Sequence, residues 1–282
     1  MDATRRALII GNGFDLNLGL KTSYQDFMEW LQYKTLIQSS HLYEHLKRKV
    51  ELNRWVDIED ELRNYSSAIL ENPILTNDAQ REYIKRSRNN FRNEYLQVCA
   101  LLRQYLKEQE SAFDLSKVVD SDALNVLDIW SRGFTTNLQV ISFNYTTFLD
   151  DKSDVVMHHV HGALDKDDFV FGIEDGEDIN KQHSFLYKSH NQGLNVNHLN
   201  DKFDDAQRLT FFGYSLGQTD HSYFDDFFKQ QSTAGCKRKI FDFYYYGQDA
   251  YDDLYWQLRT LTDKRVAKFK QFNDVNFINI KK

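Results

Sequence analysis

The feature that most constrains the fold of this 282-residue chain is a short apolar run followed at once by glycines. Residues 7–10 predict a strand buried on both faces, as in a parallel sheet covered by helices. Gly11 and Gly13 follow directly, and Ser23 with Asp26 three residues later is typical of a helix start. The chain is therefore expected to open with a strand, a glycine turn and a helix.

This opening favours an anionic ligand, because a helix N-terminus presents unpaired backbone N–H groups and the positive end of its dipole. We interpret the turn as a cradle for a nucleotide phosphate. The alternative is an ordinary tight turn, which also needs residues that accept positive φ. Leu16 stands where the dinucleotide fingerprint has its third glycine, so an ordinary Rossmann dehydrogenase is not expected. Asp15 is either a ligand contact or an Asx turn that stabilises the loop.

Residues 22–133 show the three- and four-residue apolar spacing of amphipathic helices. Helices are expected over 55–70, over 123–130 and from Asn77 or Asp78 onward. This pattern predicts a helical module inserted between the first strand and the rest of the sheet.

Strands and helices alternate in the remainder of the chain. The expected strands are 140–144, 155–160, 169–173, 209–213, 240–246 and 275–280, and the expected helices are 221–229 and 250–261. Such alternation predicts an α/β fold with a mostly parallel, doubly wound sheet. We expect a single domain over 1–282, with a nucleotide-binding core at 1–21 and 134–282 and the helical insertion at 22–133.

Composition limits the classes of function and location. The 35 basic and 42 acidic residues give a net charge of −7, without the footprint of general nucleic-acid binding. Two cysteines, Cys99 and Cys236, are too few for a disulfide framework or a cysteine-rich zinc site, and fit a reducing cytosol. The sequence shows no leader pattern and no apolar run of membrane-spanning length, so we expect a cytoplasmic protein without membrane contact.

Polar residues and glycines follow four predicted strands, at the sheet edge where doubly wound folds bind ligands. These corners are 11–15, 144–146, 161–162 and 213–215. Asn144 offers a donor and an acceptor to a ribose hydroxyl or a water, or it caps the next short helix. His161 suits a general base, or it is a histidine with satisfied hydrogen bonds at a strand end.

Two other groups of residues have side chains that could bind a metal ion or act in catalysis. His158, His159 and His161 raise the possibility of a metal site, but no cysteine or carboxylate cluster follows at short spacing, so no metal is expected. Asp57 and Glu59 lie at i and i+2 on a predicted helix, so their side chains need not share a face. This spacing is more typical of a solvated helix edge than of an active site.

Taken in order, these segments resemble the bacterial phage abortive-infection AbiH family. The opening block, residues 9–16 with 19–27, is the most specific part of the resemblance. Later blocks are similar at 55–59, 143–146, 159–162, 171–173 and 212–216 with Asp220. The resemblance covers nearly the whole chain.

A more distant similarity connects the chain to the sirtuin-like NAD-consuming fold. Gly11, Gly13 and Gly19 fall in the register of its opening glycines, and the corners that contain Asn144 and His161 resemble its Thr-Gln-Asn and His-Gly corners. The resemblance implies that Asn144 holds the ribose or the attacking water, and that His161 is the catalytic base. The nucleotide-binding residues that we expect are Gly11, Asn12, Gly13, Phe14, Asp15, Tyr24, Thr146, Gly213, Tyr214 and Ser215.

The departures from that fold indicate the chemistry. Asp15 replaces a small hydroxyl residue, Lys21 replaces a proline, and the four-cysteine zinc module of deacetylating sirtuins is absent. Protein deacetylation is therefore not expected. The resemblance implies an antiphage abortive-infection effector with NAD as its substrate, hydrolysed at the nicotinamide–ribose bond.

Two alternatives come from other classes of function. One is a non-catalytic nucleotide-sensing module that uses residues 22–133 to recruit a defence-system partner or to form a homo-oligomer. The other is a nuclease effector in which Asp57 and Glu59 hold a divalent metal. The acidic net charge argues against the nuclease.

Overall fold

The computed structural model describes residues 5–34, 40–52, 57–70, 77–131, 138–153, 155–166 and 168–281. Within them, six parallel strands form one sheet in the order β3-β2-β1-β4-β5-β6. The strands are β1 (Arg6–Ile10), β2 (Leu138–Ser142), β3 (Val155–His159), β4 (Arg208–Phe212), β5 (Ile240–Tyr245) and β6 (Asp274–Asn279). The strand order reverses between β1 and β4, as in doubly wound, Rossmann-type sheets.

The central strand β1 is buried on both faces, as its apolar run predicts. Ala7 and Ile9 pack into one hydrophobic core, and Leu8 and Ile10 pack into the opposite one. The first core contains side chains of α7 (Leu199–Asp205), α8 (Asp225–Gln231), α9 (Gly247–Leu261) and α10 (Val266–Phe272). The second contains side chains of α1 (Asn12–Asn17) and α6 (Asp122–Ser131). Helices therefore cover both faces of the sheet.

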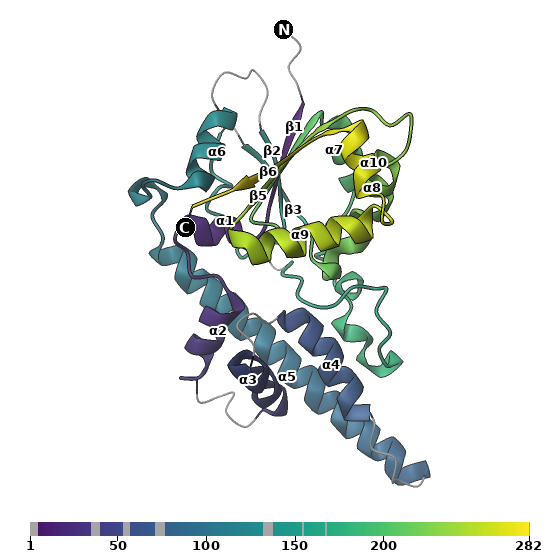
Figure 1. The fold of residues 1–282 in the computed structure, drawn as a ribbon. Helices are drawn as coiled ribbons and strands as arrows, with labels where there is room; N and C mark the ends of the chain where they lie inside the picture. The colour runs from purple at the N-terminus through teal and green to yellow at the C-terminus, as the bar shows by residue number, and fades with distance from the viewer. Residues whose placement is uncertain are drawn as a thin grey trace.

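The chain between β1 and β2 is mostly helical where it is described, as expected. Besides α1 and α6 it forms α2 (Tyr24–Leu31), α3 (His41–Leu52), α4 (Ile58–Leu70), α5 (Asn77–Ala112) and the short η2 (Leu115–Lys117). Ser23 caps α2, since its hydroxyl accepts the Asp26 amide at 3.0 Å. The 36 residues of α5 span about 54 Å, and its N-terminal end projects away from the sheet (Figure 1). Trp55 of the predicted helix 55–70 lies outside the described residues.

Helices α2 to α5 build a third core together with the chain between residues 164 and 187. This chain contains the 3₁₀ turns η3 (Lys181–Leu186) and η4 (Lys188–His190). The prediction of a strand at 169–173 is wrong: Ile173 makes only an isolated bridge with Tyr187. The segment is apolar because Phe171 and Ile173 pack against the helices and not against the sheet.

The helix predicted at 221–229 is divided in the structure. Residues Gln218–Tyr223 form the 3₁₀ turn η5, and α8 begins at Asp225. None of the described helices combines the length and the apolar character that crossing a bilayer requires.

Strand register determines where polar groups meet. Ile10 of β1 lies opposite Ser142 of β2 and Phe212 of β4, and Ser142 lies opposite His159 of β3. The turns that follow these strands therefore emerge side by side, at the edge that faces α2, α4 and α5.

Candidate functional site

A cavity of about 340 Å³ lies at the carboxyl ends of β1, β2 and β4, where residues of α2, α4 and α5 close it. Every predicted site residue except Phe14 lines it: Gly11, Asn12, Gly13, Asp15, Tyr24, Asn144, Thr146, His161, Gly213, Tyr214 and Ser215. Side chains far apart in the sequence thus converge on one space, in the position that the doubly wound topology favours.

Phe14 does not line this cavity. Its ring is fully buried and packs edge-on against Phe212, with the ring centroids 5.5 Å apart. The ring packs α1 against the sheet, and the cavity lining gives no support to its prediction as a ligand contact.

The glycines after β1 are needed for close packing between two turns. Gly13 N–H donates to the Gly213 carbonyl at 2.9 Å, and a Cβ on Gly13 would lie 2.7 Å from Gly213 Cα. Gly213 has φ of +59°, and a Cβ there would lie 2.3 Å from the Gly13 carbonyl carbon. Neither Gly11 nor Gly13 has a positive φ, so close packing explains these glycines and a tight turn does not. The Gly13 amide is already bonded and is not free to hold a phosphate.

Asp15 is a buried carboxyl group held by neutral partners. It accepts hydrogen bonds from Asn144 Nδ2 at 2.8 Å and from Thr146 Oγ1 at 2.8 Å. Burial raises the pKa of Asp15 to about 7, and these two hydrogen bonds only partly oppose the shift. The group can therefore exchange a proton near neutral pH.

Asn144 connects two strand ends. Its Nδ2 also donates to the Gly11 carbonyl at 2.9 Å, so both amide hydrogens are used. A ligand in the cavity can meet only the acceptor Oδ1 of this amide. The helix-cap alternative is not observed, because no helix follows Asn144 at residues 145–150.

Glu59 and Asp220, which also line the cavity, form buried ion pairs with Lys188. Its Nζ forms an ion pair with Glu59 Oε2 at 2.9 Å and donates hydrogen bonds to Asp220 Oδ1 at 2.9 Å and to the Thr219 carbonyl at 3.2 Å. Tyr214 donates to the other Asp220 oxygen at 2.9 Å. The sequence pattern indicated no role for Lys188, because it follows none of the predicted strands.

These contacts determine the charges. Burial opposes ionisation of Asp220, yet Lys188 and His161 hold its pKa well below the usual range. Burial raises the pKa of Glu59 to about 7, against the opposing effect of Lys188. For Lys188 itself, the neighbouring carboxylates outweigh burial and raise the pKa.

His161 lies beside this group, with Nε2 3.2 Å from Asp220 Oδ1. The angle does not satisfy hydrogen-bond geometry, so none of the residues that the structure describes bonds to this buried nitrogen. Burial lowers the pKa of His161, and Lys188 adds to the effect. The imidazole is therefore neutral at pH 7 and able to accept a proton.

Asp57 and Glu59 both line the cavity, which corrects their interpretation as a solvated helix edge. Asp57 Oδ1 accepts the Glu59 amide at 2.9 Å and so caps α4. This first turn of α4 directs both carboxyl groups toward the strand ends. The pattern of apolar spacing could not show this, because it says nothing about which turn of a helix meets another segment.

The neighbouring histidines have separate partners. His158 Nε2 lies 2.9 Å from the Asn195 carbonyl, and His159 Nε2 lies 3.0 Å from Asp150 Oδ1. Within the described parts of the chain, no three potential ligands gather in a way that would hold a metal ion.

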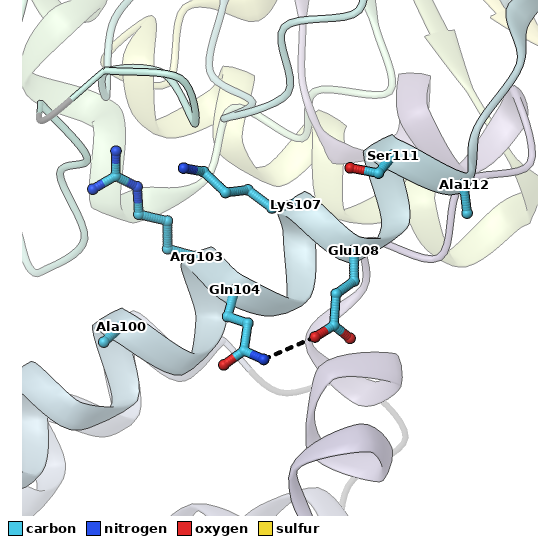
Figure 2. A pocket seen from close by; sticks show the side chains of 7 residues that line it. All are labelled: Ala100, Arg103, Gln104, Lys107, Glu108, Ser111 and Ala112. Atoms are coloured by element: carbon cyan, nitrogen blue, oxygen red, sulfur yellow. Dashed lines mark hydrogen bonds between the residues drawn. The ribbon is translucent and has the colours of Figure 1, made fainter.

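Figure 2 shows a second hollow, of about 850 Å³, along one face of α5. Its lining residues all come from this helix: Ala100, Arg103, Gln104, Lys107, Glu108, Ser111 and Ala112. Gln104 donates to Glu108 at 2.8 Å, and Arg103 donates to the Leu164 carbonyl at 3.2 Å. This hollow is formed by one helix, whereas the smaller cavity gathers side chains from several strand ends and helices, so we take the smaller cavity as the candidate site.

A family model described as Bacteriophage abortive infection AbiH matches residues 7–242. The chain belongs to the AbiH family. The match extends from β1 into β5 and contains every cavity-lining residue of this AbiH-family protein. The family indicates a role in abortive infection by bacteriophage. Among curated proteins, none matches the chain.

Proposed function

We propose that this AbiH-family protein acts in phage defence by hydrolysing the nicotinamide–ribose bond of NAD or a related nucleotide. The observation that supports the proposal is that Asn144, His161 and the turn after β1 line a single cavity. These groups follow different strands, and only the parallel sheet brings them together.

The reaction uses groups already described. Asn144 Oδ1 accepts a hydrogen bond from the attacking water, and the neutral His161 takes the proton of that water. The water oxygen bonds to the anomeric carbon while the N-glycosidic bond breaks. The electron pair of the broken bond stays on the ring nitrogen, and nicotinamide leaves as a neutral molecule. The Asp220 carboxylate, 3.2 Å from His161 Nε2, stabilises the imidazolium that forms.

A sirtuin-like core is part of this proposal. In support, Gly11 and the start of α1 follow β1, Asn144 follows β2, His161 follows β3 and Ser215 follows β4, in the chain order that the resemblance requires. Ser215 is exposed and lines the cavity, where a nucleotide could contact it. Residues 22–133 remain our proposed region for a defence-system partner or self-association.

The carboxyl groups fit the nuclease alternative less well. A metal-dependent nuclease needs carboxylates free to gather about a divalent ion. Glu59 and Asp220 instead share the Lys188 ammonium, with both oxygen–nitrogen distances 2.9 Å. A divalent cation between these two groups would have to displace that lysine.

The test is nicotinamide release from NAD by the purified protein, alone and with lysate of phage-infected cells. We expect release from the wild type, and a loss of about 10²–10⁴-fold in His161→Ala, the range for a lost general base. Asn144→Ala should also lose activity. His198→Ala is the matched control, because His198 is exposed and does not line the cavity.

Thermal melting of each variant separates loss of chemistry from loss of folding. The proposal fails if the wild type releases no nicotinamide under either condition, or if folded His161→Ala retains full activity. Nucleotide binding without turnover, with phage protection intact in His161→Ala, would support the sensing module instead.

A further inference from the structure

The cavity has an unusual charge pattern for a nucleotide site. Four carboxyl groups line it, those of Asp15, Asp57, Glu59 and Asp220, and no lysine or arginine occurs among its described lining residues. Lys188 lies outside the lining, and its ammonium is already bonded to Glu59, Asp220 and the Thr219 carbonyl. A phosphate placed here would lie beside the ionised Asp220 and would find no free lysine or arginine among these lining residues.

Aromatic rings form much of the remaining wall. They are Tyr24, Phe143, Tyr145 and Tyr214. Phe143 and Tyr214 stack with ring centroids 4.3 Å apart. Aromatic faces together with carboxylates provide the environment that attracts flat organic cations, because the ring quadrupole and the acid charge act in the same direction.

An independent observation indicates a ligand in this space. His161 lines the cavity and is only 4 % exposed, and its Nε2 makes no hydrogen bond of good geometry with a described residue, although Asp220 Oδ1 lies 3.2 Å away. Buried polar atoms of this kind nearly always have a partner in the functional state. A polar group of a ligand inside the cavity would supply it.

We infer that the cavity binds a flat, cationic heteroaromatic ring that carries a sugar, while phosphate groups stay outside it. Identifying that ring as the oxidised nicotinamide rests on the proposed function. During hydrolysis the positive charge moves from the ring to the oxocarbenium-like sugar, so the same carboxylates face a cation before and during bond cleavage.

The test compares ligands that separate charge, shape and phosphate. The probes are nicotinamide riboside, its neutral reduced form, 7-methylguanosine as a cationic purine riboside, and ribose 5-phosphate. Binding is measured by calorimetry, and free nicotinamide is followed by NMR in the same samples. We expect the oxidised riboside to bind at least about tenfold more tightly than the reduced one, a difference of about 1.4 kcal/mol. Ribose 5-phosphate should show no binding.

A conservative variant tests the charge directly. Asp57→Asn removes one carboxylate and keeps the oxygen that caps α4. This variant should bind the oxidised riboside about fivefold more weakly than the wild type and bind the reduced riboside with unchanged affinity. Asp114→Asn is the matched control, because Asp114 caps η2 through the Ser116 amide and does not line the cavity.

The outcomes distinguish this inference from the proposed function. Equal binding of oxidised and reduced riboside overturns the charge selectivity, and nicotinamide release would still support hydrolysis. Binding of 7-methylguanosine without nicotinamide riboside supports a cationic ring and refutes the nicotinamide substrate. If no probe binds, the inference is overturned, whatever the NAD hydrolysis assay shows.

Discussion

Two buried aspartates that line one cavity are held in opposite ways. Asp15 accepts hydrogen bonds from the neutral side chains of Asn144 and Thr146, and burial raises its pKa to about 7. Asp220 is equally buried, but Lys188 beside it keeps its pKa well below the usual range.

The difference teaches that burial alone does not determine the charge of a carboxyl group. Asp15 can exchange a proton at neutral pH, whereas Asp220 carries a fixed negative charge next to His161. Two acids with separated pKa values in one site are the pattern expected where different groups have different catalytic roles. The following predictions test whether the partners cause the difference.

The largest effect is expected from Lys188→Met. It leaves two buried carboxyl groups, Glu59 and Asp220, without their shared cation, so we expect a loss of about 3–5 kcal/mol in the free energy of unfolding. Lys239→Met is the control, since the buried Lys239 ammonium donates to the carbonyls of Asp204 and Ala206. Urea unfolding measures both, and an equal loss in the two variants would contradict a special role for Lys188.

Asp220→Asn should lower the free energy of unfolding by about 2–3 kcal/mol at pH 7.5, because it removes a charged hydrogen-bond acceptor of Lys188 and Tyr214. The folded pKa of Asp220 is lowered, so its stabilisation is present above about pH 4 and is lost as pH falls through the folded value. The difference between variant and wild type should therefore shrink in acid. A difference that is constant with pH would show that the ionised form is not what stabilises the fold.

Tyr214→Phe tests one hydrogen bond to the same carboxylate. Removal of the hydroxyl that donates to Asp220 at 2.9 Å should cost about 1.5–2 kcal/mol, less than the loss of the charge itself. Chemical unfolding at pH 7.5 measures it. A loss as large as that of Asp220→Asn would assign the main stabilisation to the tyrosine and not to Lys188.

Asp15→Asn should have the smallest effect and the opposite sign. The folded pKa of Asp15 is raised, so its contribution to stability is complete below about pH 4 and is lost as pH rises through about 7. The variant lacks this titration and should gain about 1 kcal/mol relative to wild type as pH rises from 5 to 6. Glu59 titrates in the same range in both proteins, so their difference isolates Asp15. A variant that loses stability at pH 7.5 would show that the ionised form stabilises this corner.

The sequence could predict those parts of the fold that depend on local pattern. Five of the six strands predicted after β1 are present as β2 to β6, because short apolar runs indicate them. The cap at Ser23 follows from its spacing to Asp26. The error at 169–173 arose because an apolar run is the same whether it pairs in a sheet or packs beneath helices.

The cavity itself was predictable to a large degree, because in a parallel sheet the residues after neighbouring strands must meet at one edge. Asn144 and His161 were found in this way. Lys188 was not, because it follows no strand and its partner Glu59 lies on a helix more than a hundred positions earlier.

The sequence by itself thus determined the parallel α/β core and the corners that line the cavity, because period and strand ends are local properties. Only the tertiary structure decided the charges and the hydrogen bonds. It determines which carboxyl group is paired with a lysine, which backbone amide is already bonded, and which histidine nitrogen lacks a well-aligned hydrogen bond. The physical reason is that pKa values and hydrogen-bond satisfaction depend on burial and on distant partners, and folding alone brings those partners together.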